Sequence, residues 1–168
     1  RLPMENKKWT LMEGIFQPLD KEEPMEKETF KTIMYTGGVY HRRGLEILLE
    51  AFNLIKDDTY RLWIRGNGSM EDEIKQRAKK DPRIIYFEPM SREELLKLER
   101  RATVMINPTP PSQEFTKYFF PSKTMEYLAS GTPTMMYRLG CMPKEYDKHV
   151  YYIDDEKVET LRDKIIEI

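Results

Sequence analysis

Two segments of the sequence place cationic side chains next to backbone that can approach an anion. The first covers residues 37–44 and contains Gly37, Gly38, Arg42 and Arg43. Glycine lets the backbone approach a ligand closely, and the planar guanidinium of arginine matches the geometry of phosphate oxygens. These residues therefore predict a phosphate-binding loop. The alternative is a tight turn whose two arginines are simply solvated.

The second segment is an expected helix start at Pro121, Ser122 and Lys123. The free N–H groups of a first helical turn and the positive end of the helix dipole attract an anion. Lys123 puts a full positive charge where that dipole disfavours it, which is costly unless an anion binds nearby.

Glu126 lies four residues after Ser122 and therefore on the same side of this helix. A carboxylate would repel a bound phosphate. We therefore expect Glu126 to accept hydrogen bonds from hydroxyl groups, such as those of a ribose. The alternative is an ordinary acidic residue near a helix start.

Alternating strand and helix patterns must position these two segments. Strand patterns cover residues 32–39, 60–64, 83–87, 103–107, 134–137 and 150–153, and a helical pattern or a helix-like run follows most of them. Six β-α units with short connections predict an α/β fold, a Rossmann-like doubly wound parallel sheet of about six strands. In the usual strand order 3-2-1-4-5-6, a ligand lies beyond the carboxyl ends of the first and fourth strands. Residues 37–44 and 108–121 follow those two strands, so the candidate segments should meet there.

The composition is that of one globular domain. The 168 residues are 39% hydrophobic and 34% charged, which excludes a disordered chain. A formal net charge of −1 creates no overall field that would favour nucleic acid or an anionic membrane. We expect one domain over residues 32–168, preceded by a linker or edge segment over residues 1–31. Because the chain starts without methionine and stops inside a helix-like run, we also expect it to be cut from a longer protein.

The sequence offers little for a metal site or a disulfide. It contains two histidines, His41 and His149, and one cysteine, Cys141. These are too few for a His/Cys metal site. A single cysteine excludes an internal disulfide and fits a reducing compartment.

At these segments the sequence resembles the C-terminal domain of glycosyltransferase family 4, over about residues 10–168. The similarity lies in residues 35–38 (YTGG), 43–45 (RGL), 48–52 (LLEAF), 62–68 (LWIRGNG) and, most strongly, 120–133 (FPSKTMEYLASGTP). The resemblance implies the donor-binding half of a GT-B enzyme. Such an enzyme would transfer a sugar from a nucleoside-diphosphate donor, UDP- or GDP-linked, with retention of configuration and without a metal or cofactor.

The resemblance also implies residue roles. Arg43 takes the basic position that binds the donor diphosphate, together with Lys123 and backbone N–H groups at Ser122. Glu126 takes the place of the second glutamate of the E-x7-E motif, which holds the donor ribose. Tyr118 stands where the family has the first glutamate of the motif, which contacts the transferred sugar, and we count it among the expected donor-binding residues. Gly38 stands where the family has a second cation, so Arg42 or Lys123 would replace it.

Further expectations follow from the resemblance. The acceptor would bind a missing N-terminal domain. If the protein associates peripherally with a membrane, it would do so through that domain. The protein would be cytoplasmic, or, if it associates with the membrane, it would lie at the cytoplasmic face. It would serve bacterial surface polysaccharide or glycoconjugate synthesis.

One alternative is a non-catalytic nucleotide-binding or regulatory domain of the same fold. Tyr118 leaves this alternative open, because it replaces a glutamate of the family motif. A nicotinamide-dependent dehydrogenase is disfavoured because the first loop lacks the G-x-G-x-x-G spacing.

Overall fold

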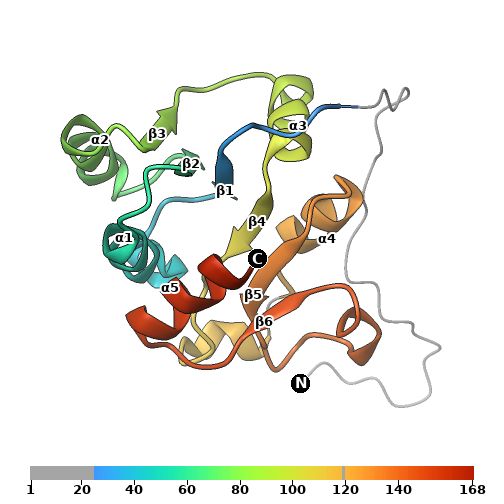
Figure 1. The fold of residues 1–168 in the computed structure, drawn as a ribbon. Coiled ribbons are helices and arrows are strands. Elements are labelled where there is room, and N and C mark those ends of the chain that lie inside the picture. The colour runs from blue at the N-terminus through green and yellow to red at the C-terminus, as the bar shows by residue number, and fades with distance from the viewer. Residues whose placement is uncertain (1–24, 119) are drawn as a thin grey trace, which may run out of the picture.

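The computed structural model describes residues 25–118 and 120–168, which form a parallel sheet of six strands (Figure 1). The strand order is β3-β2-β1-β4-β5-β6. The strands are β1 (Lys31–Thr36), β2 (Tyr60–Arg65), β3 (Ile84–Phe87), β4 (Val104–Asn107), β5 (Thr134–Tyr137) and β6 (Tyr151–Ile153). Every neighbouring pair is parallel. The predicted fold class and the reversal of strand order between β1 and β4 are both confirmed.

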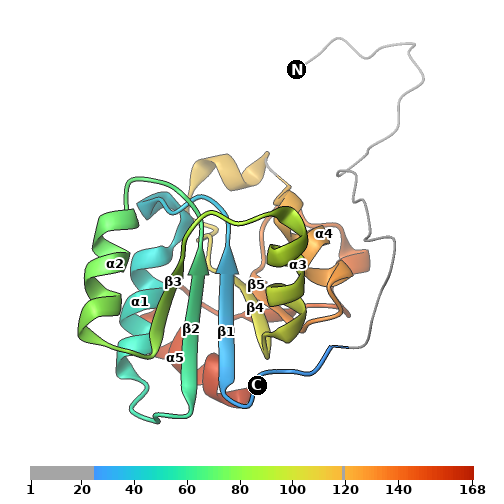
Figure 2. The same ribbon diagram turned by 90° about the horizontal axis from the view of Figure 1, so that it is seen from above.

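Helices cover both faces of the sheet. The α-helices are α1 (Leu45–Leu54), α2 (Glu71–Lys80), α3 (Arg92–Arg101), α4 (Ser122–Ala129) and α5 (Val158–Glu167). The short 3-10 helices are η1 (His41–Arg43), η2 (Glu114–Lys117) and η3 (Lys144–Tyr146). Figures 1 and 2 show α1, α2 and α5 on one face of the sheet and α3 and α4 on the other. This is the doubly wound arrangement.

Apolar side chains at helical spacing explain α1. Leu45, Leu48, Leu49 and Phe52 are fully or almost fully buried, and they fall at the i, i+3, i+4 and i+7 positions of one face. On the opposite face of the sheet a smaller cluster, which includes Met34, Trp63 and Tyr127, packs beneath α3 and α4. The sheet is therefore buried on both sides, as parallel sheets require.

Two serines that precede helices behave differently. Ser91 forms a complete capping box with Glu94 at the start of α3. Ser69 stands three residues before Asp72 in a similar pattern, but it does not cap α2. The N-cap is Met70, which is fully buried, and its N–H donates to the Val39 carbonyl at 3.0 Å. Burial of Met70 moves the helix start by one residue and leaves Ser69 exposed.

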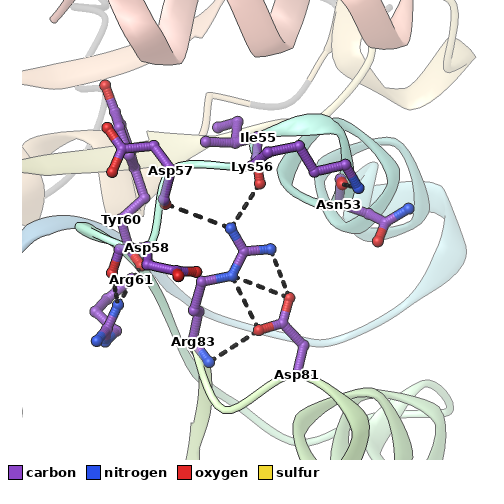
Figure 3. Close-up of polar contacts among 9 residues, drawn as sticks. All are labelled: Asn53, Ile55, Lys56, Asp57, Asp58, Tyr60, Arg61, Asp81 and Arg83. Atoms are coloured by element: carbon purple, nitrogen blue, oxygen red, sulfur yellow. Dashed lines mark hydrogen bonds and ion pairs between the residues drawn. The ribbon is translucent and has the colours of Figure 1, made fainter.

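Arg83 ties together two connections at the amino ends of the strands, the one between α1 and β2 and the one between α2 and β3 (Figure 3). One guanidinium nitrogen donates to the Ile55 carbonyl, just after α1, at 2.6 Å. The other nitrogens contact the Asp81 carboxylate at 2.7–3.2 Å. These contacts fix the end of the sheet that lies opposite the candidate loops.

Residues 25–30, the described part of the segment before β1, contact the rest of the domain. Lys27 Nζ donates to the Ala102 carbonyl at 2.9 Å and to Thr132 Oγ1 at 2.8 Å. The rest of the expected linker, residues 1–24, lies outside the described residues. Among the described residues, no helix is long and apolar enough to cross a membrane.

Candidate functional site

A small cavity of about 90 Å³ lies where the carboxyl ends of β1 and β4 meet the start of α4. Six of the predicted site residues line it, namely Gly37, Gly38, Arg43, Pro121, Ser122 and Lys123. Five further lining residues were not predicted, namely Tyr35, Thr36, Asn107, Thr109 and Tyr127. The two candidate segments therefore come together at the predicted point of the sheet.

Four of the unpredicted residues lie at or just after strand ends, and this position in the sequence is a feature from which they could have been predicted. Tyr35, Thr36 and Asn107 are the last residues of β1 and β4, and Thr109 follows two residues later. Polar side chains that end adjacent parallel strands at a reversal of strand order are candidates for a ligand site. Thr109 Oγ1 donates to Asn107 Oδ1 at 2.8 Å, which orients the amide.

Two glycines let backbone segments come close at this cavity. Gly44 has φ 75°, and a Cβ there would lie 1.9 Å from the Pro108 carbonyl oxygen. A Cβ on Gly66 would lie 1.6 Å from the Gly37 carbonyl oxygen. Gly44 therefore sets the approach of the first loop to the loop after β4, and Gly66 sets its approach to the end of β2.

The glycine loop is also held by Tyr35. The Tyr35 hydroxyl donates to the Gly38 carbonyl at 2.7 Å. Burial raises the pKa of the Tyr35 phenol well above its usual value, although the nearby Arg43 charge opposes this shift. The phenol therefore stays protonated and keeps its donor role.

The two arginines of the first loop lie in different settings. Arg43 is partly buried, lines the cavity and lies over the Phe115 ring at 5.4 Å from its centroid. Arg42 is exposed, does not line the cavity and lies over the Tyr40 ring at 5.2 Å. Of the two, Arg43 is placed to meet an anion in the cavity.

The start of α4 combines backbone amides with a charged pair. Its N-cap is Pro121, whose side chain makes no capping hydrogen bond. Lys123 contacts the Glu126 carboxylate in a close ion pair, with the Glu126 side chain 19% exposed. Glu126 does not line the cavity. The two residues predicted for different parts of the ligand thus bind each other in this structure.

Glu99 is a further acidic residue at this place, and the sequence did not predict it. Its side chain is 0% exposed, and its Oε1 accepts from Thr36 Oγ1 at 2.8 Å and lies 3.9 Å from Lys123 Nζ. Burial and the neighbouring Glu126 carboxylate raise the pKa of Glu99 to about 8. Burial penalises the charged form of an acid, and the second carboxylate adds to that penalty.

Tyr127 fixes α4 to the end of β1. Its hydroxyl donates to the Thr36 carbonyl at 2.6 Å and accepts from the Thr36 N–H at 3.0 Å. Complete burial raises the pKa of Tyr127 well above its usual value. Tyr127 thus bonds both backbone polar groups of Thr36 and sets the distance from the start of α4 to the first loop.

Tyr118 is not brought to the cavity. Its side chain is 85% exposed, and it follows η2 as that helix ends. The residue that stands in place of the first motif glutamate is therefore solvent-exposed and does not line the predicted diphosphate site. The proposed roles of Arg42, Tyr118 and Glu126 stay predictions.

A larger hollow of about 820 Å³ lies elsewhere, at the amino ends of β5 and β6. Its walls include Leu128, Pro133, Glu145, His149 and Tyr151. Ligands of doubly wound sheets bind at the carboxyl ends of the strands, so its size does not make it the better candidate. Among the described residues, no three His, Cys, Asp or Glu side chains gather as they would around a metal ion.

Comparison with known proteins agrees with the fold. A family model described as "Glycosyl transferases group 1" matches residues 30–168. Comparison with curated protein sequences found no match.

Solved structures share the fold. The C-terminal domain of a glycosyl transferase group 1 family protein (LpcC) from Francisella tularensis has a TM-score of 0.65 and 17% identity, over 85% of this chain and 76% of that one. A mutant of S. aureus TarM, solved in complex with ligands that include UDP, has a TM-score of 0.70 and 17% identity, over 88% of this chain. Anabaena HepE in complex with UDP and glucose has a TM-score of 0.63 and 13% identity, over 82% of this chain. The chain spans only 30% of the length of TarM and 38% of that of HepE.

Proposed function

Because the chain belongs to the glycosyl transferases group 1 family, we propose that it is the donor-binding, C-terminal half of a GT-B glycosyltransferase of family 4. The proposed substrate is a UDP- or GDP-linked sugar, transferred with retention of configuration and without a metal or other cofactor. The acceptor would bind an N-terminal domain, in a cytoplasmic enzyme of surface polysaccharide or glycoconjugate synthesis. The support is one observation: two loops that carry cations and backbone amides meet at the carboxyl ends of β1 and β4.

The site can stabilise a leaving diphosphate. Arg43 and Lys123, which line the cavity from two different segments, supply two positive charges. The first amides of α4 add the positive end of a helix dipole. Charge that develops on the departing diphosphate is then met by groups already in place, which is how such sites lower a barrier without a metal.

Binding requires the pair of Lys123 and Glu126 to open. In this structure the ammonium and the carboxylate neutralise each other. When Lys123 turns to a phosphate oxygen, Glu126 is released to accept hydrogen bonds from the ribose hydroxyls. One rearrangement would thus prepare both contacts.

Nucleotide binding is tested by thermal unfolding with UDP, GDP and ADP. A nucleotide at about 100 times its Kd stabilises the fold by roughly 2.7 kcal/mol. We expect a clear increase in Tm with one of these nucleotides and none with ribose alone. If no nucleoside diphosphate at millimolar concentration shifts Tm, the proposed site is wrong.

Single substitutions assign the roles. Arg43→Ala and Lys123→Ala should each weaken diphosphate binding. The binding that remains in each variant should depend less on salt concentration. Lys79→Ala, on the exposed end of α2, removes the same charge far from the cavity and serves as the control. Glu126→Gln should mainly weaken ligands that carry ribose hydroxyls. If Glu126→Gln weakens inorganic pyrophosphate and the nucleotide equally, the ribose role is excluded.

The alternative function is a non-catalytic nucleotide-binding domain of the same fold. The observation that favours it is the exposed Tyr118 in place of the first motif glutamate. Sugar transfer by a full-length protein that contains this chain would exclude it. The chain alone should bind nucleotide without transferring sugar, because the cleft of a GT-B enzyme needs both domains.

A further inference from the structure

Glu99 is a buried carboxyl group in contact with the donor site, and the function proposed above gives it no role. It projects from α3 toward the carboxyl end of β1 and the first turn of α4. One carboxyl oxygen accepts from Thr36 Oγ1 at 2.8 Å. The other, Oε2, is buried and has no hydrogen-bond partner among the described residues. A buried carboxylate in such a position is much more costly than the neutral acid.

The ionisable groups around Glu99 come mostly from α4. Lys123 Nζ lies 3.9 Å from Glu99 Oε1 and pairs closely with Glu126. Tyr127 bonds the backbone of Thr36 beside the carboxyl group, and burial keeps it neutral. One ammonium thus stands between two carboxyl groups.

Within residues 25–118 and 120–168, neighbouring elements contribute no second cation paired with the Glu99 carboxyl group. Arg65 is the register partner of Thr36 on β2, but its Nη1 donates to Asn67 Oδ1 at 3.0 Å. Lys27 donates to Thr132 Oγ1, and that hydroxyl in turn donates to the backbone carbonyl of Glu99. The charge of this cluster is therefore decided by whether Glu99 carries a proton.

We propose that Glu99 is a positioning residue that controls diphosphate binding through Lys123. As a neutral acid it leaves the ammonium shared with Glu126 alone, so that Lys123 can turn to the diphosphate. As a carboxylate it holds Lys123 back and adds a negative charge beneath the phosphate site. This role rests on the proposed donor site.

The proposal predicts a loss of nucleotide affinity in mild alkali. Burial and the Glu126 carboxylate raise the pKa of Glu99 to about 8. An acid with that pKa is about one-tenth ionised at pH 7 and about nine-tenths ionised at pH 9, so Kd should rise about tenfold. The diphosphate itself is almost fully ionised over most of this range, and comparison between variants cancels its residual titration.

The experiment measures Kd for the best-binding nucleoside diphosphate by calorimetry at pH 7 and pH 9. We expect the ratio of the two values to be about ten for the wild-type chain and close to one for Glu99→Gln, which keeps the shape without the titration. Glu50→Gln removes an exposed acid from α1 and should keep the wild-type ratio. A ratio in Glu99→Gln equal to that of the wild type overturns the proposal while leaving the donor site intact. If no variant binds any nucleoside diphosphate, the donor site is wrong and the role of Glu99 fails with it.

A second measurement does not depend on the folding of a variant. Carboxyl-carbon NMR of the unliganded wild-type chain should show one glutamate that titrates near pH 8, well above ordinary glutamates. If every glutamate titrates in the ordinary acidic range, Glu99 is already a carboxylate at neutral pH and the proposal is overturned.

Discussion

Replacing Gly44 by alanine should destabilise the domain by separating the two loops of the candidate site. Gly44 lies between η1 and α1 with φ 75°, and its N–H donates to the His41 carbonyl at 2.9 Å. An alanine Cβ would lie 1.9 Å from the Pro108 carbonyl oxygen and 3.1 Å from Cδ of Pro110. The obstacle is mainly backbone, so no side-chain rotation relieves it.

Two costs combine in this variant. A left-handed conformation costs a residue other than glycine about 1–2 kcal/mol. Forcing a methyl group into packed structure costs about a further 1–3 kcal/mol. We therefore expect Gly44→Ala to lose about 2–5 kcal/mol of unfolding free energy, a large part of the roughly 5–15 kcal/mol that holds an ordinary domain together.

The chain contains two controls that separate these costs. Gly131 has a similar φ of 74° but no atom within 4 Å of the added Cβ, so Gly131→Ala should show the conformational cost alone. Gly140 also has open space and no left-handed backbone, so Gly140→Ala should be nearly neutral. Urea unfolding of the three variants gives the comparison. Equal losses for Gly44→Ala and Gly131→Ala would refute the close packing of the two loops, and unchanged nucleotide affinity in Gly44→Ala would show that this packing does not shape the site.

Three further variants test other contacts. Arg83→Met should lower the unfolding free energy by about 2–3 kcal/mol, because charge-assisted hydrogen bonds are lost. The nucleotide site lies at the opposite end of the sheet, so its Kd should not change. An increased Kd, measured by calorimetry without urea, would contradict this. Tyr127→Phe should lower the unfolding free energy measured in urea by about 1–3 kcal/mol, since it leaves both backbone groups of Thr36 without that partner. It should also weaken nucleotide binding by releasing α4. Unchanged stability together with unchanged nucleotide affinity would contradict this. For Glu99, the folded state keeps a proton that the unfolded state releases near pH 4.3, so wild-type stability should fall between about pH 4.5 and 8. Thermal unfolding should therefore show that the stability of Glu99→Gln rises relative to that of the wild type across this pH range. If the two curves of stability against pH run parallel, Glu99 is not a buried neutral acid.

The sequence by itself determined the order of elements and the place of the site. Strand patterns and helical spacing are local properties, so residues 134–137 were predicted with the bounds of β5, and the other strands within three residues. The alternation of strands and helices then limits the topology, because parallel crossovers have a fixed hand. From that topology alone, residues 37–44 and 108–121 could be expected to meet.

Only the tertiary structure decided which side chains interact at the site. Glu99 falls in a polar helix, and its sequence neighbours give no sign that its side chain is 0% exposed. Its contact with Thr36 joins residues 63 apart, and the bonds of Tyr127 to Thr36 join residues 91 apart. Such contacts depend on which helix crosses which strand and at what depth, and neither is a property of a short segment. For the same reason, the pairing of Lys123 with Glu126 and the exposure of Tyr118 were not predictable, since each depends on what the folded chain places beside the residue.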